Sequence, residues 1–261
     1  MFSASAEYES FMGRWSRLIA PGYIAFAGVK SGERVLDVGA GTGSLGSALV
    51  ERFPSNEVVG IDPSVEFIAH AQQQAKPGRT RYEVGDAQAL PFPDASFDHA
   101  MALLVMNFIP DPSRAIAEMR RVTRPKGIVS ACVWDYNEGM QMLRLFWDEA
   151  VDLDPAAQPR DERHTKLCRQ GQLASLWNAA GLAEVQEKPL EVDLRFSSFD
   201  DYWIPFTKGV GPAGARVASL SGESKGQLEA RLRRRLLGGG PDRPFVLRAR
   251  AWCVRGEASG H

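Results

Sequence analysis

Hydrophobic and polar positions along the first half of the chain alternate between short apolar runs and longer amphipathic stretches. The apolar runs predict five strands, at 34–39, 57–62, 80–86, 97–104 and 127–134. Helical spacing between them predicts helices at 43–53, 63–75 and 112–124, the last two with a proline in the first turn. Because strands and helices alternate, the pattern predicts a mostly parallel α/β sheet with helices on both faces.

The pattern changes after Trp134. Residues 136–168 contain an amphipathic helix on which Met142, Phe146 and Ala150 share one face, followed by a polar stretch. A helix at 170–180 then leads into a long alternating strand, a helical segment punctuated by glycine and proline, and a final alternating strand. These two terminal strands complete a seven-stranded sheet, in which we expect the last strand to pair antiparallel at one edge.

Composition narrows the classes of protein. The 261 residues are 44% apolar and 24% charged, and 31 basic and 32 acidic side chains give a net charge of −1. No global field therefore attracts nucleic acid or an anionic membrane. The three cysteines are far apart, which favours a reducing compartment without disulfides. With no signal-peptide pattern and a longest apolar stretch of about half a membrane span, we expect a cytoplasmic protein.

The stretch VLDVGAGTGSLG, residues 35–46, fits two ligand classes. Gly41 to Gly46 spell G-x-G-x-x-G, a dinucleotide-binding pattern in which the following helix binds a pyrophosphate. Gly39 to Gly43 spell G-x-G-x-G behind Asp37, which suits a nucleoside with a methionine moiety. The helix would then bind its carboxylate and Asp37 its α-amino group. Asp62 suits either ligand, because both carry a ribose diol.

Three carboxylates, those of Asp37, Asp62 and Asp86, stand at the ends of successive predicted strands. Any one of them is equally well explained by a turn, where aspartate hydrogen-bonds the backbone. The series favours a ligand site, because ligands of open α/β sheets bind outside the carboxyl ends of the strands.

The next stretch, GDAQALPFPDASFD at 85–98, resembles the class I S-adenosylmethionine-dependent methyltransferases. The pattern is most similar to the ubiquinone/menaquinone-biosynthesis-like small-molecule group. Matching pieces include VLDVGAGTG, VVGIDPS and FIPDPSRAIAEMRRVTRPKG, and the resemblance is strongest over 34–135. It implies a Rossmann-like fold, S-adenosylmethionine as cofactor, and in-line transfer of its methyl group. The density of large apolar residues in the two helical segments after Trp134 favours a small, partly apolar metabolite as the acceptor.

The resemblance also implies cofactor contacts. Asp62 would accept both ribose hydroxyls, Asp86 would meet the exocyclic amine of adenine, and Ala87 would donate its N–H to a ring nitrogen. The glycine turn would line the methionine end, and Arg14 would act as a lid residue unless its helix is only a surface anchor. The full set of implied cofactor contacts is Arg14, Asp37, Gly39, Ala40, Gly41, Thr42, Asp62, Pro63, Asp86, Ala87, Leu103 and Leu104.

Catalytic residues are harder to identify. Asn107 and Phe108 stand where related methyltransferases often have histidines, so the sequence shows no general base in this loop. A base is needed only if the acceptor starts protonated. Asn107 can orient a substrate carbonyl or hydroxyl, and Asp135 and Tyr136 are further candidates for substrate contacts.

The resemblance and the pattern together predict one methyltransferase domain over 1–261. Its parts are N-terminal lid helices (1–30), a cofactor-binding core (31–135), a helical cap (136–168 and 197–243) and terminal strands (182–196 and 244–256). We expect large apolar residues of the cap to wall a substrate pocket with Leu104, Asn107 and Tyr136, unless helix packing accounts for them. These cap residues are Met140, Met142, Phe146, Trp147, Phe199, Tyr202, Trp203 and Phe206.

Three other functions stay open as alternatives. An NAD-binding oxidoreductase of the short-chain type would need Tyr-x-x-x-Lys, which none of the five tyrosines provides. An RNA methyltransferase would use the basic run RLRRRLL at 231–237, although its arginines fit an exposed helix face. The third alternative is a non-catalytic S-adenosylmethionine-binding module. We expect no metal, because His70, His99, His164 and His261 are scattered.

Overall fold

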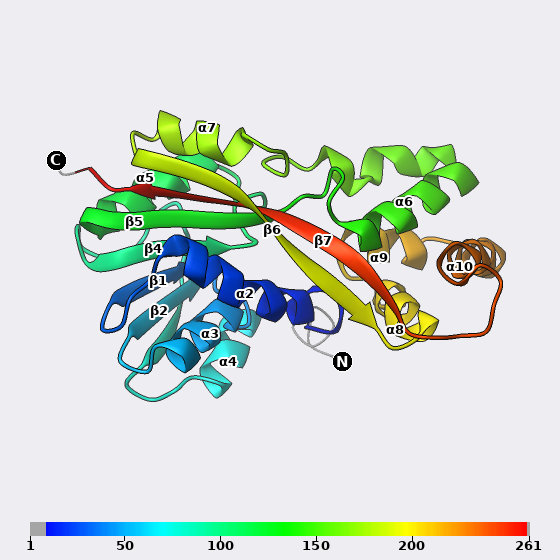
Figure 1. The fold of residues 1–261 in the computed structure, drawn as a ribbon, viewed down its shortest axis with the longest axis horizontal. Coiled ribbons are helices and arrows are strands. Elements are labelled where there is room, and N and C mark those ends of the chain that lie inside the picture. The colour runs from blue at the N-terminus through cyan, green and yellow to red at the C-terminus, as the bar shows by residue number, and fades with distance from the viewer. Residues whose placement is uncertain (1–8, 260–261) are drawn as a thin grey trace. The chain divides into compact units, whose positions relative to one another are not determined.

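The computed structural model describes residues 9–259 (Figure 1). Residues 1–8, for which the sequence predicts no signal peptide, and His261 lie outside the described residues. Packing divides the chain into two compact units. The sheet unit comprises Gly13–Val133, Lys166–Leu190 and the chain from Ala251 onward, and the helical unit comprises Trp134–Thr165, Glu191–Arg250 and the segment ending at Met12. The division into a single domain with a helical cap at 136–168 and 197–243 stays a prediction.

A seven-stranded sheet has the strand order β3-β2-β1-β4-β5-β7-β6. Its strands are β1 (Arg34–Val38), β2 (Glu57–Asp62), β3 (Thr80–Val84), β4 (Phe97–Leu103), β5 (Thr123–Trp134), β6 (Ala183–Phe196) and β7 (Phe245–Glu257). The first five pair in parallel. Backbone hydrogen bonds join Lys126 N to Ala258 O and Asp135 N to Arg250 O, so β7 lies antiparallel to β5. The predicted fold class is therefore confirmed.

Helices α2 (Arg14–Ala27), α3 (Ser44–Arg52), α4 (Val65–Gln73), α5 (Pro112–Val122) and α7 (Gln172–Ala179) belong to the sheet unit. One local prediction is wrong: Pro63 does not stand in the first turn of α4. Ser64 caps that helix, its hydroxyl accepting a hydrogen bond from Phe67 N at 3.2 Å, so Pro63 precedes the helix. Pro112 does occupy the first turn of α5.

The helical unit holds α6 (Gln141–Leu153), α8 (Phe199–Trp203), α9 (Gly211–Ala218) and α10 (Gly222–Leu237). Short helical turns accompany them: η2 (Pro155–Arg160), η3 (Glu162–His164) and η4 (Ile204–Lys208), while η1 (Glu9–Gly13) precedes α2. No helix within residues 9–259 combines the length and the apolar character needed to cross a membrane.

Aromatic side chains form the interior of the helical unit. The Phe146 and Phe206 rings stack with centroids 4.6 Å apart, Phe11 meets Phe206 edge-on at 5.0 Å, and the Tyr202 hydroxyl donates to Met142 O at 3.0 Å. All eight large apolar residues expected to line a cap pocket are at most 4% exposed. Core packing therefore accounts for much of this aromatic density, and the substrate pocket stays a prediction.

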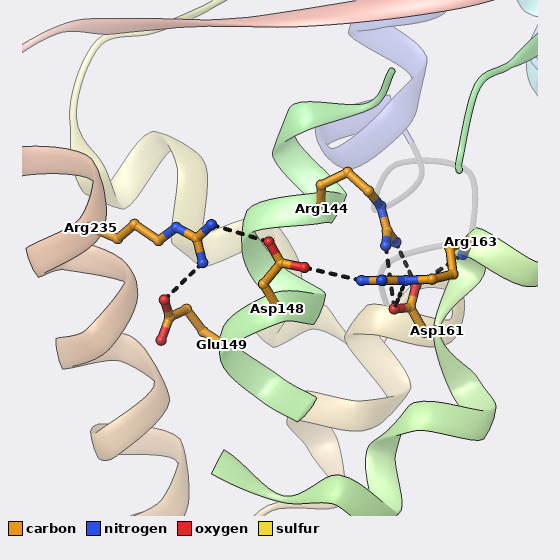
Figure 2. A network of polar contacts seen from close by, with 6 residues as sticks. All are labelled: Arg144, Asp148, Glu149, Asp161, Arg163 and Arg235. Carbon is orange, nitrogen blue, oxygen red and sulfur yellow. Dashed lines mark hydrogen bonds and ion pairs between the residues drawn. The ribbon is translucent and has the colours of Figure 1, made fainter. Parts of the chain in front are cut away.

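Alternating charges tie the helices of this unit together (Figure 2). Asp161 lies between two guanidinium groups, accepting from Arg144 Nη2 and from Arg163 Nε at 2.5 Å each. Asp148 accepts from Arg163 at 3.0 Å and from Arg235 of α10 at 3.1 Å. Because the Asp161 side chain is 1% exposed, these contacts compensate a charge that is almost fully desolvated.

Candidate functional site

The turn between β1 and α3 is fixed by its own backbone and by β2. Gly39 N and Ala40 N both donate to Ile61 O, at 2.8 and 3.0 Å, and Gly43 N donates to Ala40 O at 2.9 Å. Gly39, Gly41 and Gly43 have φ angles of 70°, 53° and 89°. Residues with a side chain rarely adopt these left-handed values, so the turn needs glycine at all three positions.

The glycines of this turn meet different surroundings. A Cβ on Gly39 would lie 2.5 Å from a Val105 methyl, and one on Gly43 would lie 2.9 Å from the Tyr82 hydroxyl. A Cβ on Gly46 would come still closer to that hydroxyl. At Gly41, by contrast, an added Cβ meets nothing within 4 Å. Gly41 therefore opens onto free space, whereas the other three glycines make room for neighbouring side chains.

Asp62, at the end of β2, faces this turn. Its Oδ2 accepts from Gly41 N at 3.0 Å and its Oδ1 accepts from Ser64 N at 2.9 Å. Burial raises the pKa of Asp62, and the two backbone N–H groups oppose that rise. Each carboxylate oxygen can accept a second hydrogen bond, so Asp62 braces the turn and still presents acceptors. The brace on Gly41 is a contact that the sequence pattern does not reveal.

Asp37 lies deeper, 1% exposed, and neither carboxylate oxygen makes a hydrogen bond of normal length and angle among the described residues. Burial raises its pKa to about 7, the Gly46 N–H stabilises the charged form only in part, and the charge of Asp62 adds a smaller rise. Buried carboxylates in native proteins are normally hydrogen-bonded. This orphaned group beside the glycine turn fits a site that receives a cationic or hydrogen-bond-donating ligand group.

Asp86 and Ala87 follow β3. Ala87 is 9% exposed, whereas the Asp86 carboxylate is exposed and accepts hydrogen bonds from Gln88. Hydrogen bonds from the Gln88 backbone and side chain lower the pKa of Asp86. Sequence reasoning missed Gln88, although an aspartate whose side chain accepts from the backbone N–H two residues on is common in turns.

The segment after β4 approaches the glycine turn through Val105. Leu104 has a φ of 61°, an uncommon value for leucine, and its N–H donates to Cys132 O at 2.7 Å. Asn107 is 5% exposed, and neither atom of its amide group has a partner among residues 9–259. Phe108 beside it is 65% exposed. A strained backbone with an orphaned amide is typical of a ligand-binding segment.

The remaining predicted site residues lie as follows. Leu103 and Leu104 are each 8% exposed and Thr42 is 6% exposed, while Pro63 is exposed at the end of β2. The Arg14 guanidinium stacks on Trp15, 4.1 Å from the ring centroid, in the first turn of α2. The structure thus brings Gly39, Gly41 and Asp62 into one turn region.

Asp135 and Tyr136 belong to the helical unit. Asp135 Oδ2 accepts from Arg250 Nη2 at 2.6 Å and from Nε at 2.9 Å, and Oδ1 accepts from Glu138 N at 3.0 Å. Both oxygens of this carboxylate, which is 2% exposed, are therefore hydrogen-bonded. These bonds support a structural role for Asp135, and the substrate contact stays a prediction. Tyr136, 6% exposed, is buried beside it in the chain.

Comparison with known proteins agrees with this geometry. Residues 36–131 match the family described as "Methyltransferase domain". The chain is 40% identical over 115 residues to a demethylmenaquinone methyltransferase of Deinococcus radiodurans. The matched stretch covers 43% of this chain and 46% of that protein. The chain spans about half the length of the curated relatives it matches, 44% of one and 63% of another.

Solved structures share the fold. A putative methyltransferase of Bacillus halodurans C-125 superimposes with a TM-score of 0.60 at 18% identity, covering 92% of this chain and 99% of that one. The phosphoethanolamine N-methyltransferase 2 of Haemonchus contortus, solved with S-adenosyl-L-methionine, gives 0.56 at 17% identity, covering 91% and 52%. At these identities the likeness concerns the fold.

Proposed function

Because residues 36–131 belong to the S-adenosylmethionine-dependent methyltransferase family, whose cofactor is S-adenosylmethionine, we propose that this protein methylates a small, partly apolar metabolite. The observation that carries the proposal is the glycine turn, where Gly41 opens onto free space while Asp62 lies within hydrogen-bonding distance of the same residue. A ligand with a ribose next to an amino-acid end fits this arrangement. The Asp62 carboxylate can accept from the ribose, and the backbone at Gly41 leaves room for the amino-acid end.

In this proposal each residue of the turn region contacts a different part of the cofactor. Asp62 accepts the ribose hydroxyls, Gly39 to Thr42 line the methionine end, and the orphaned Asp37 carboxylate receives the ammonium group. An ammonium partner stabilises the charged form of Asp37 and therefore lowers its pKa. Arg14 binds the methionine carboxylate.

The adenine and sulfonium ends involve the next two turns. Pro63 flanks the adenine ring, Asp86 accepts from its exocyclic amine, and the Ala87 N–H donates to a ring nitrogen. Leu103 and Leu104 cover the side from which the methyl group leaves. The bound cofactor supplies an electrophilic methyl group on a sulfonium, so the protein contributes mainly orientation and exclusion of water.

Asn107 is the residue we assign to the acceptor. Its amide offers one acceptor oxygen and two N–H donors, and all of these lack partners in the described chain. It therefore orients a neutral polar group of the acceptor, such as a hydroxyl or carbonyl, without removing a proton. The exposed ring of Phe108 and the apolar acceptor named for the demethylmenaquinone relative support an acceptor with an apolar part.

The basic run in α10 favours this proposal over RNA methylation. Arg231 pairs with Glu149 at 2.8 Å and also with Asp152. Arg235 pairs with Glu149 at 3.0 Å and with Asp148 at 3.1 Å, as Figure 2 shows. Cations held by carboxylates of the same unit are poorly available for phosphates.

Calorimetric titration with S-adenosylhomocysteine and with NAD tests the cofactor. We expect micromolar or tighter binding of S-adenosylhomocysteine and none of NAD. Tight NAD binding alone would favour the oxidoreductase alternative. Labelled S-adenosylmethionine with fractionated metabolites then tests the acceptor: transfer to bulk RNA alone would overturn the small-molecule assignment, and binding without transfer to either would indicate a non-catalytic module.

A further inference from the structure

The side chain of Gln88 links the turn after β3 to the start of α5. Its Nε2 donates to both carboxylate oxygens of Asp86, at 3.1 Å to Oδ1 and 3.2 Å to Oδ2. Its backbone N–H donates to Asp86 Oδ1 at 2.8 Å. At the other end, Gln88 Oε1 accepts from Asp111 N at 3.0 Å. Asp111 is the N-cap of α5, its carboxylate accepting from Arg114 N at 3.0 Å.

These contacts fix which way the amide of Gln88 points. Because Oε1 accepts from a backbone N–H, the NH₂ group must be the end that faces Asp86. The same hydrogen bonds, followed by the charge of Arg114, lower the pKa of Asp86. Asp86 is thus held ionised and acts only as a hydrogen-bond acceptor. Oδ2 takes one described hydrogen bond and has a lone pair left for a ligand.

We propose that Gln88 is a positioning residue that aims the Asp86 carboxylate at the base of the bound nucleoside and so selects adenine over hypoxanthine. The inference rests on the proposed function, in which Asp86 meets the exocyclic amine. An exposed carboxylate without Gln88 would rotate among several orientations, and ordering it on binding would cost entropy.

The chemistry of the two bases gives the selection its direction. Adenine carries an amine at this position, which donates to an ionised carboxylate. Hypoxanthine carries a carbonyl oxygen there, which only accepts and is repelled by the same carboxylate. A site that fixes an acceptor therefore rejects the base that lacks the donor. Arg114 strengthens this by favouring the ionised form of Asp86.

The test measures binding of S-adenosylhomocysteine and of its inosine counterpart to wild type, Gln88→Ala, Asp86→Ala and a control, Gln72→Ala. Gln72 is a matched control because its Nε2 also donates to an oxygen of the sheet unit, Tyr82 O at 3.1 Å, but contacts no part of Asp86. We expect wild type and Gln72→Ala to prefer adenosine about tenfold or more. In Gln88→Ala the logarithm of the ratio of the two affinities should fall to about a third of its wild-type value or less. The fall should come mainly from weaker binding of S-adenosylhomocysteine.

A second measurement needs no ligand. The pKa of the Asp86 carboxyl, followed by NMR, should rise toward its ordinary value in Gln88→Ala and stay unchanged in Gln72→Ala. A purely structural role for Gln88 would instead weaken both nucleosides equally, and that result would overturn the proposal. An undiminished preference in Asp86→Ala would also overturn it while leaving the methyltransferase assignment intact. If wild type binds neither nucleoside, the proposed function fails together with the inference.

Discussion

Asp62 Oδ2 accepts a hydrogen bond from Gly41 N at 3.0 Å, so the end of β2 holds the one glycine of the turn that opens onto free space. One carboxylate thus sets the position of the backbone beside which a ligand would lie and also offers acceptors to that ligand. The amino-acid end and the ribose end of a bound nucleoside are in this way coupled through a single side chain.

Substitution of Asp62 should therefore have graded effects. Asp62→Ala removes the brace and the ribose acceptor together, and we expect S-adenosylhomocysteine to bind about ten- to a hundredfold more weakly. Asp62→Asn keeps one acceptor oxygen and should fall between that variant and wild type. Calorimetry measures both. Equal affinity in all three proteins would remove Asp62 from the ligand site, and Asp94→Ala, an exposed carboxylate paired with Arg121, is the control.

The glycines should separate folding from binding. Gly39→Ala forces a Cβ to 2.5 Å from Val105 at a φ of 70°, and we expect a loss of roughly 2 kcal/mol of unfolding free energy. Gly41→Ala meets open space, so its stability cost should be confined to the backbone term, roughly 1 kcal/mol. Its Cβ fills the space proposed for the ligand, and binding should fall instead. Denaturant melts and calorimetry on both variants distinguish the two effects.

Stability should depend on pH through Asp37. Its folded pKa of about 7 lies above the ordinary value of 3.8, so its stabilising contribution is complete below about pH 4 and declines as pH rises to about 7. Asp37→Asn cannot ionise. Relative to wild type it should gain stability by about 2–3 kcal/mol between pH 5 and pH 8, at 1.4 kcal/mol per pKa unit. Urea melts at both pH values measure this.

The comparison of Asp37→Asn with wild type also cancels other titrating groups. Burial raises the pKa of Glu162 to about 7 as well, but that residue is the same in both proteins. A difference in stability that is independent of pH would show that Asp37 is ionised in the folded protein throughout this range.

The charge network of the helical unit should be fragile at Asp161. Asp161→Asn leaves the Arg144 and Arg163 guanidinium groups without their shared carboxylate, and we expect a loss of about 3 kcal/mol or more. Asp193→Asn removes an exposed pair with Arg195 and should cost less than about 1 kcal/mol. Thermal unfolding of the two variants gives the comparison, and similar midpoints for both would contradict the expectation.

Substitution of Asn107 should lower methyl-transfer activity without lowering the stability of the fold. Asn107→Ala removes a buried amide that has no partner in the described chain, so unfolding should be unchanged or slightly harder. Methyl transfer should nonetheless fall, with a higher KM for the acceptor. A marked loss of stability would show instead that the amide supports the fold.

Sequence alone located the fold well because β1, β2, β4 and most of β5 coincide with local apolar runs, and β6 and β7 with alternating ones. β2 begins and ends where predicted, at Glu57 and Asp62. The error at Pro63 arose because Ser64 competes for the helix start, and only its hydrogen bond to Phe67 decides the matter. The brace from Asp62 to Gly41 and the role of Gln88 depend on contacts between separate turns, which periodicity does not encode.

The same limit applies to the aromatic residues of the helical unit. Their density in the sequence fits a substrate pocket and a compact core equally well, because both need large apolar side chains. Only the stacking of Phe146 on Phe206, and the burial that accompanies it, shows that they pack against one another.

Tyr82 has a consequence for how such sequences evolve. Its ring and hydroxyl occupy the space in which Gly43, Gly46 and Gly60 would each place a Cβ. The side-chain volumes at Tyr82 and at these three glycines must therefore change together. An alanine at Gly46 fits only after Tyr82 is replaced by a smaller residue. In homologous chains the glycine pattern and a bulky residue on β3 should consequently covary. Gly46 completes the dinucleotide-like G-x-G-x-x-G pattern. It would be conserved because Tyr82 leaves no room for a side chain, even in proteins that bind no phosphate.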